Sequence, residues 1–118
     1  MPVNKRERGA QGENLAVDYL KKKGYRILER NFRFERGEID IVAEDNGELV
    51  FVEVKARRST SFGEPEDAVT ISKQSQLQKV AEGYLYKNNI DGKECRFDVI
   101  AIQYKNGKAN IRHFENAF

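Results

Sequence analysis

Four charged residues interrupt two apolar runs in the stretch GEIDIVAEDNGELVFVEVKARR, residues 37–58. Glu38 and Asp40 lie in the first run, and Glu53 and Lys55 lie in the second. A charged side chain is costly to bury unless it is paired or binds a metal. Neighbouring carboxylates suit a hard cation such as Mg²⁺, and a nearby lysine can orient or deprotonate an attacking water. The pattern therefore predicts a metal site suited to hydrolysis.

The two runs predict antiparallel strands over about 38–43 and 49–55, joined by a two-residue turn at Asn46-Gly47. Asn-Gly favours such a turn because both of its central residues need positive φ. Counting back from the turn pairs Asp40 with Glu53 and Glu38 with Lys55, with paired Cβ atoms about 5 Å apart. The same register gathers the apolar residues on one shared face and pairs Ile39 with Val54, Ile41 with Val52, and Ala43 with Val50.

A simpler interpretation is that these charges line the solvated face of a half-exposed sheet, with Lys55 in a salt bridge to Glu38 or Glu53. Two carboxylates directly opposite each other are destabilising unless a positive charge lies between them, which favours the metal site. A one-residue slip would move one strand's charges to the other face. The apolar pairing argues against that slip.

Other elements must hold this hairpin in a sheet. Apolar spacing predicts helices over about 10–23 and from about 66 or 72 to 88. Further strands are expected over 25–34, with an irregularity at Arg30-Asn31, over 95–104, and over 109–114 after Asn106-Gly107. A helical crossover before the strand at 95–104 implies that this strand is parallel to the one at 49–55. The order helix-strand-strand-strand-helix-strand predicts an α/β fold with a mixed central sheet flanked by helices.

Composition limits the classes of protein that remain. The 118 residues suit one domain over 1–118, and 21 basic against 19 acidic residues leave a net charge of only +2. One cysteine, Cys95, excludes an internal disulfide, and one histidine, His113, excludes catalysis by a histidine pair. The N-terminus lacks the apolar core of a signal peptide, and no apolar run is long enough to span a bilayer. We expect a cytoplasmic protein without membrane association.

The combined motifs resemble those of a group of nucleases. GEID, then FVEVK after a hairpin, then RFDVIAI after a helix resemble the PD-(D/E)XK superfamily and its restriction-endonuclease-like core. Over nearly its whole length the chain is similar to the uncharacterised bacterial YraN-type proteins, relatives of archaeal Holliday junction resolvases. The segments that carry this likeness are GENLAVDYLKKKGYRILERNFR, GEIDIVA, VFVEVKARR, FGEP, CRFDVI and HFENAF.

The resemblance implies a metal-dependent endonuclease that acts on DNA, with branched, Holliday junction-like DNA as its substrate class. It makes Asp40, Glu53 and Glu13 ligands of Mg²⁺, or alternatively Mn²⁺, and Lys55 the catalytic lysine. From the residues alone, Glu13 is more simply an exposed glutamate in the first turn of a helix. Ile39 stands where the superfamily pattern has a proline, a departure that bears on activity more than on fold. A junction resolvase needs two active sites, so a homodimer is expected.

Basic residues close to the predicted site in the sequence could contact DNA phosphates, and solubilising charge explains them equally well. They are Arg33, Arg36, Arg57, Arg58 and Lys73. Asp98 interrupts an apolar strand and is expected to pair structurally rather than to act in catalysis. Two other functions stay open: a nucleic-acid-binding or scaffold protein that keeps the fold without turnover, and an acidic patch that serves a structural ion or a partner protein.

Overall fold

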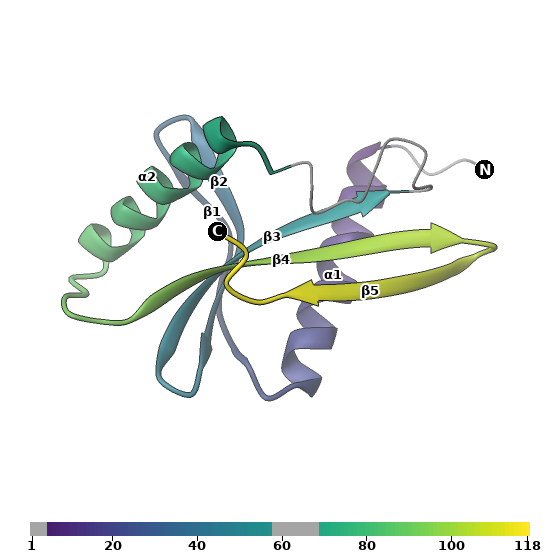
Figure 1. Cartoon of the computed structure of the whole chain (residues 1–118), viewed down its shortest axis with the longest axis horizontal. Helices are drawn as coiled ribbons and strands as arrows, with labels where there is room; N and C mark the ends of the chain where they lie inside the picture. The colour runs from purple at the N-terminus through teal and green to yellow at the C-terminus, as the bar shows by residue number, and fades with distance from the viewer. Residues whose placement is uncertain (1–4, 58–68) are drawn as a thin grey trace.

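A five-stranded mixed sheet forms the centre of the computed structural model, which describes residues 5–57 and 69–118 (Figure 1). The strands lie in the order β1-β2-β3-β4-β5, with β3 and β4 parallel and the other neighbours antiparallel. This confirms the predicted α/β class, element order and parallel pair. The elements are α1 (Lys5–Lys22), β1 (Arg26–Phe34), β2 (Gly37–Asp45), β3 (Glu48–Arg57), α2 (Ile71–Lys87), β4 (Cys95–Lys105) and β5 (Lys108–Phe114).

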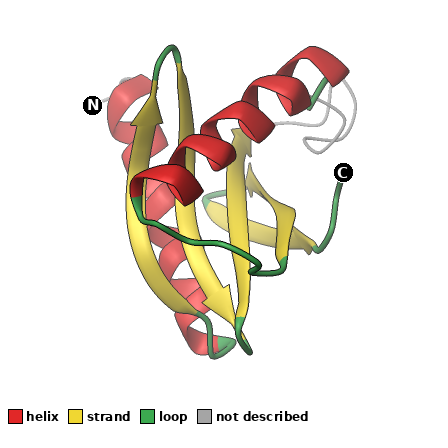
Figure 2. Ribbon diagram, turned by 90° about the vertical axis from the view of Figure 1, so that its left-hand side faces the viewer, coloured by secondary structure: helices red, strands yellow, loops and turns green. Residues whose placement is uncertain are grey.

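The two helices cover opposite faces of the sheet, so the fold has three layers (Figure 2). On the α1 face, Leu20 and its helical neighbours pack against apolar residues of β2, β3 and β4. On the α2 face, Leu77, Val80 and Tyr84 pack around the fully buried Phe51 of β3. Both faces of β3 are therefore covered, and the half-exposed sheet assumed in the simpler interpretation of the sequence is wrong.

Local chemistry explains where the elements begin and end. Asn46 and Gly47 have φ of 50° and 85°, and Asn106 and Gly107 have φ of 53° and 74°, which confirms both predicted Asn-Gly turns. The side chain of Thr70 caps α2 by accepting the backbone N–H of Lys73 at 3.1 Å. Helix α1 begins earlier than predicted, and the predicted loop over 59–65 lies outside the described residues. No described helix has the length and apolar character needed to cross a bilayer.

Strand β2 changes face at Asp40. Ile41 and Ala43 pack on the α1 face, but Ile39 packs on the α2 face, so the prediction of one shared face for all three is wrong. Arg30 and Phe32 of β1 pair with Ile41 and Ile39, so Asn31 stands level with Asp40, and its φ of 55° confirms the predicted irregularity. The register of β1 with β2 also shifts earlier, between Ile27 and Glu29. A left-handed residue in one strand interrupts the regular pleat beside its neighbour, and the alternation of β2 breaks there.

A buried polar network joins the start of β4 to the end of the chain. Asp98, 1% exposed, accepts Arg96 Nε at 3.0 Å and the backbone N–H of Asn116 at 3.0 Å. His113 Nε2 lies 2.7 Å from the other carboxylate oxygen of Asp98. Arg96 also reaches Glu48 Oε1 at 2.9 Å, next to the β2–β3 turn. Asp98 is a structural pairing residue, as expected.

We expect Asp98→Asn to lower the free energy of unfolding by roughly 3 kcal/mol at pH 7, because Arg96 then loses its buried anionic partner. Burial by itself would raise the pKa of Asp98, but hydrogen bonds from His113 and Arg96 outweigh burial and lower it. A lowered pKa gives stability that is present above the unfolded value, about 3.9, and is lost as the pH falls further. Denaturant unfolding should therefore show the gap between wild type and variant closing below about pH 4. A gap that is constant down to pH 2 would contradict this account.

Candidate active site

The site begins where β2 and β3 part. Their ladder runs from Asp45–Glu48 to Ile41–Val52, and the predicted pairs Ile39–Val54, Asp40–Glu53 and Glu38–Lys55 are not part of it. In place of a strand–strand bond, Asp40 Oδ2 accepts the backbone N–H of Val54 at 2.8 Å. The predicted register is correct, but the carboxylate of Asp40 enters the gap between the two strands instead of standing beside Glu53 on a regular sheet.

Glu53 is the buried carboxylate of the site. It follows Phe51 on the α2 face of β3 and is 8% exposed. Its Oε1 lies 3.6 Å from Lys55 Nζ, whereas its Oε2 is buried without a hydrogen-bond partner among the described residues. Burial raises the pKa of Glu53, against the positive charges of Lys73 and Lys55, which lower it. The salt bridge between Lys55 and Glu53, which the simpler interpretation predicted, is thus present, and it leaves the other oxygen of Glu53 without a partner among the described residues.

Asp40 is held close enough to Glu53 for the two charges to interact. Burial raises the pKa of Asp40 to about 7, and the negative charge of Glu53 adds to this effect. The hydrogen bond from Val54 opposes the shift, and the charges of Glu38 and Glu13 add to it. Two carboxylates that disfavour each other's ionisation form an electrostatic environment that attracts a cation.

Glu13 lies in α1 with its side chain turned toward β1. It is buried, so its interpretation as an exposed first-turn glutamate is wrong. Its Oε1 accepts Arg30 Nε at 2.7 Å and Asn31 Nδ2 at 3.0 Å. Within residues 5–57 and 69–118, no three His, Cys, Asp or Glu side chains are grouped so that they could hold one metal ion. The role of Glu13 as a metal ligand stays a prediction.

The donor set of Asp40 and Glu53 fits a hard divalent cation. Mg²⁺ commonly takes one or two protein carboxylates and keeps several waters, so a third carboxylate is not required. The buried, unpartnered Oε2 of Glu53 is the observation that favours this fit, because a carboxylate oxygen is costly to bury unsatisfied. The solvated-face interpretation leaves that oxygen unexplained.

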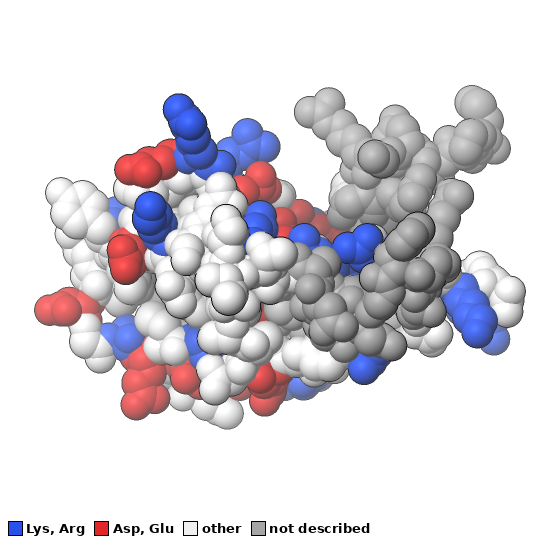
Figure 3. All heavy atoms as spheres, turned by 45° about the horizontal axis from the view of Figure 1, so that its top comes forward, with Lys and Arg blue, Asp and Glu red and all other residues white. Residues whose placement is uncertain are grey.

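The predicted phosphate-binding residues occupy different surroundings. Arg33 is mostly exposed, and its Nε lies 3.4 Å from Glu38 Oε2. Lys73 lies in α2, and its positive charge acts to lower the pKa of Glu53 in β3. Arg36 is exposed in the β1–β2 turn and Arg57 is exposed at the end of β3, while Arg58 lies outside the described residues. On the face drawn in Figure 3, basic side chains lie beside acidic ones rather than forming one continuous basic field.

Sequence reasoning missed the residues that hold Glu13. Arg30 bridges Glu13 and Asn14, with Nη2 2.6 Å from Asn14 Oδ1, and Asn31 adds its amide to Glu13. The irregular Arg-Asn step in β1 was the available signal, because asparagine tolerates the left-handed conformation that turns its side chain toward α1. The step therefore connects α1 to the strand that flanks Asp40.

Comparison with known proteins places the chain among bacterial relatives. Residues 12–102 match the model described as "Uncharacterised protein family UPF0102". A UPF0102 protein of Persephonella marina is 50% identical over 94% of this chain and 92% of its own length. One from Syntrophomonas wolfei is 52% identical over 96% and 98%, and one from Geobacter metallireducens is 48% identical over 100% and 97%. These names state a family and no activity.

Among solved structures, the chain is similar to "The structure of Pyrococcus Furiosus SfsA in complex with Ca2+". The TM-score is 0.39 at 15% identity, and the match covers 96% of this chain but 64% of the other. The chain thus spans less than two thirds of that protein. A likeness this distant carries no argument about the site.

Removing the charge of Asp40 should stabilise the metal-free protein. A folded pKa of about 7 lies above the unfolded value of about 3.9, so stability is lost as the pH rises through 7. In chelator at pH 8, we expect Asp40→Asn to unfold with a free energy roughly 2 kcal/mol higher than wild type, and the difference to vanish near pH 4. Glu94→Gln, at an exposed position, is the control and should change little. A variant less stable than wild type at pH 8 would contradict the burial of a charged Asp40.

A bound metal ion should offset the loss of stability that the ionised, buried Asp40 causes. At 100 times its dissociation constant, a cation that binds only the folded state adds about 2.7 kcal/mol. We expect Mg²⁺ or Mn²⁺ to raise the melting temperature of wild type by several degrees and chelator to remove the effect. Asp40→Asn and Glu53→Gln should lose the response, and Glu94→Gln should keep it. An equal response in all four proteins would show that the metal binds elsewhere.

Proposed function

This chain belongs to the uncharacterised protein family UPF0102, and we propose that its Asp40–Glu53 site makes it a Mg²⁺-dependent endonuclease that hydrolyses DNA phosphodiesters. One observation carries the proposal: Oε2 of the buried Glu53 has no hydrogen-bond partner among the described residues, while Oε1 lies 3.6 Å from Lys55 Nζ and the charge of Asp40 interacts with this carboxylate. A cluster of buried, incompletely paired charges lowers the stability of the fold, so its presence indicates a function such as binding a cation.

Asp40 and Glu53 would hold the ion, either Mg²⁺ or Mn²⁺. Bound there, a divalent cation polarises a phosphate and lowers the pKa of water. The main-chain N–H of Val54 fixes the carboxylate of Asp40, so this ligand is oriented before any metal arrives. Glu53 is positioned by its burial between β3 and α2 and by its pairing with Lys55.

Lys55 is the residue that connects the carboxylates to the solvent. Its side chain is 25% exposed, and its ammonium lies 3.6 Å from Glu53 Oε1. From that position it can donate to a phosphate oxygen or orient the attacking water. Positive charge there offsets the negative charge that develops on phosphate during hydrolysis.

The DNA substrate, its branched form and a homodimeric assembly are parts of this proposal that follow from the resemblance to the resolvases. Exposed Arg36 and Arg57 supply cations near the two strands that carry Asp40 and Glu53. Cations flanking a carboxylate site attract the phosphate backbone that the carboxylates alone would repel.

A nucleic-acid-binding protein without turnover is the second candidate. It is favoured by the 2.7 Å pairing of Glu13 with Arg30, because an ion pair of this length competes with metal binding by Glu13 and leaves Asp40 and Glu53 as the carboxylates to hold the ion. The nuclease predicts DNA cleavage that requires Asp40 and Lys55. The protein without turnover predicts DNA binding that requires the basic residues, and no cleavage.

We expect the protein to cut labelled four-way junction or flap DNA in Mg²⁺ or Mn²⁺ and not in chelator. Asp40→Asn and Lys55→Ala should each lower the cleavage rate at least about 100-fold, the scale of losing one group that stabilises developing charge. Lys105→Ala, which removes an exposed lysine at the end of β4, is the control for Lys55→Ala and should retain activity.

Asp40→Asn is expected to be folded and more stable without metal, so its inactivity would report chemistry rather than unfolding. Binding of DNA by wild type with no cleavage in either metal would favour the protein without turnover. Cleavage that survives Asp40→Asn would rule out this site as the catalytic centre.

A further inference from the structure

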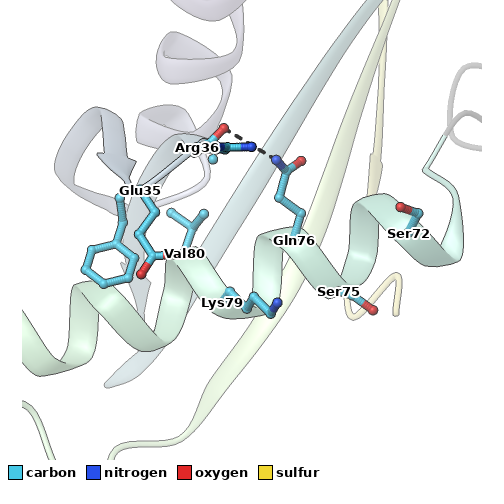
Figure 4. Close-up of a pocket in the computed structure, with 9 residues that line it drawn as sticks. Glu35, Arg36, Ser72, Ser75, Gln76, Lys79 and Val80 are labelled. Carbon is cyan, nitrogen blue, oxygen red and sulfur yellow. Dashed lines mark hydrogen bonds between the residues drawn. The ribbon is translucent and has the colours of Figure 1, made fainter.

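A groove of about 940 Å³ lies between the first half of α2 and the β1–β2 turn (Figure 4). Arg36 and Glu35 belong to its turn side, and α2 contributes Ser72, Ser75 and Lys79. Val80 closes it toward the core. The groove lies outside the carboxylate cluster, and the metal site makes no use of the α2 residues that line it.

The two walls of the groove are held at a fixed separation. Gln76 Nε2 donates to the backbone carbonyl of Arg36 at 3.4 Å, which bridges the helix to the turn. Gly37 lies so close to α2 that a Cβ there would be 2.3 Å from Val80 Cγ2. The turn therefore cannot approach further, and only glycine fits at this contact.

The α2 wall presents hydrogen-bond donors to solvent. Ser72, Ser75 and Lys79 are spaced three and four residues apart, so they share one face of the helix. All three are exposed, and their side chains have no hydrogen bond or ion pair in the part of the chain that the structure describes. Hydroxyl and ammonium donors on one rigid element are the groups that contact phosphate and sugar oxygens.

The groove borders the candidate active site. Gly37 lines the groove, and Asp40 lies three residues further along β2, about 10 Å at the rise of a strand. At the other wall, Ser72 precedes Lys73, whose charge acts on Glu53. The groove is therefore within reach of a strand whose phosphate occupies the site.

We propose that this groove binds the sugar–phosphate backbone of the nucleic-acid strand that flanks the phosphate at the Asp40–Glu53 site. Arg36 and Lys79 contact phosphates, and Ser72, Ser75 and Gln76 contact phosphate or sugar oxygens. The lining combines the apolar side chains of Phe34 and Val80 with polar ones, and its two cations outnumber the single carboxylate, Glu35. The proposal rests on the proposed function for the identity of the ligand.

Binding of a labelled four-way junction and of a labelled single strand, measured in chelator, tests the groove without any cleavage. Arg36→Ala with Lys79→Ala should raise the dissociation constant about tenfold at 0.1 M salt, because two phosphate contacts are lost. On single-stranded DNA, the plot of the logarithm of the association constant against the logarithm of the salt concentration should become less steep by roughly 1.4, because two phosphate contacts are lost. Lys105→Ala with Lys108→Ala removes the same charge from the strand ends on either side of the β4–β5 turn and should change both quantities much less.

Single charge changes give a signed test. Glu35→Gln should tighten binding, because it removes the one carboxylate in the groove. Ser75→Asp should weaken binding more than Gln78→Glu, which adds the same charge to α2 outside the groove. If these two changes raise the dissociation constant equally, the effect comes from net charge rather than from the groove, and the proposal is overturned.

Failure of the groove and failure of the nuclease are distinguishable. If wild type cuts DNA and the Arg36/Lys79 variant binds as tightly as its control, the groove is overturned while the nuclease stands. If the groove variants weaken binding as expected and wild type never cuts, the groove stands while the nuclease fails. If wild type binds neither probe at low salt, the groove is overturned.

Discussion

The hydrogen bond from the Val54 backbone to the carboxylate of Asp40 is the interaction on which the candidate site depends. It forms where β2 and β3 stop pairing, so a side chain replaces a main-chain acceptor at the point where the sheet opens. Because an unpaired buried N–H is costly, this bond offsets the loss of the ladder. It also turns a carboxylate into the gap, next to Glu53, at a place where a regular sheet would keep the two strands in register.

Two clusters of buried charge in this fold differ in how completely their carboxylates are paired. Around Asp98, Arg96 and His113 satisfy both carboxylate oxygens, and the pKa of Asp98 is lowered despite burial. Around Glu53, one oxygen has no partner among the described residues and the pKa is raised by burial. The first arrangement stabilises the fold by joining β4 to the C-terminal segment. The second costs stability, as expected for groups kept for binding a cation.

The arrangement of charge explains how a nearly neutral chain could bind a polyanion. Acidic residues are placed where β2 and β3 part, and the cations Arg36 and Lys79 lie beyond them along the groove at α2. In the complex proposed above, a strand contacts these cations on its flank while one phosphate approaches the carboxylates. Net charge does not reveal this separation, because opposite charges on different elements cancel in the sum.

Sequence by itself determined the element order, both Asn-Gly turns and the pairing of Ile41 with Val52, because hydrophobic period and turn chemistry are local properties. It also singled out Asp40, Glu53 and Lys55, since charges inside apolar runs need a reason. Only the tertiary structure decided that α2 covers the face of Glu53, that Ile39 leaves the face of Ile41, and that Glu13 bonds Arg30. Those outcomes depend on packing between elements far apart in the chain and on a strand irregularity whose direction no local pattern specifies.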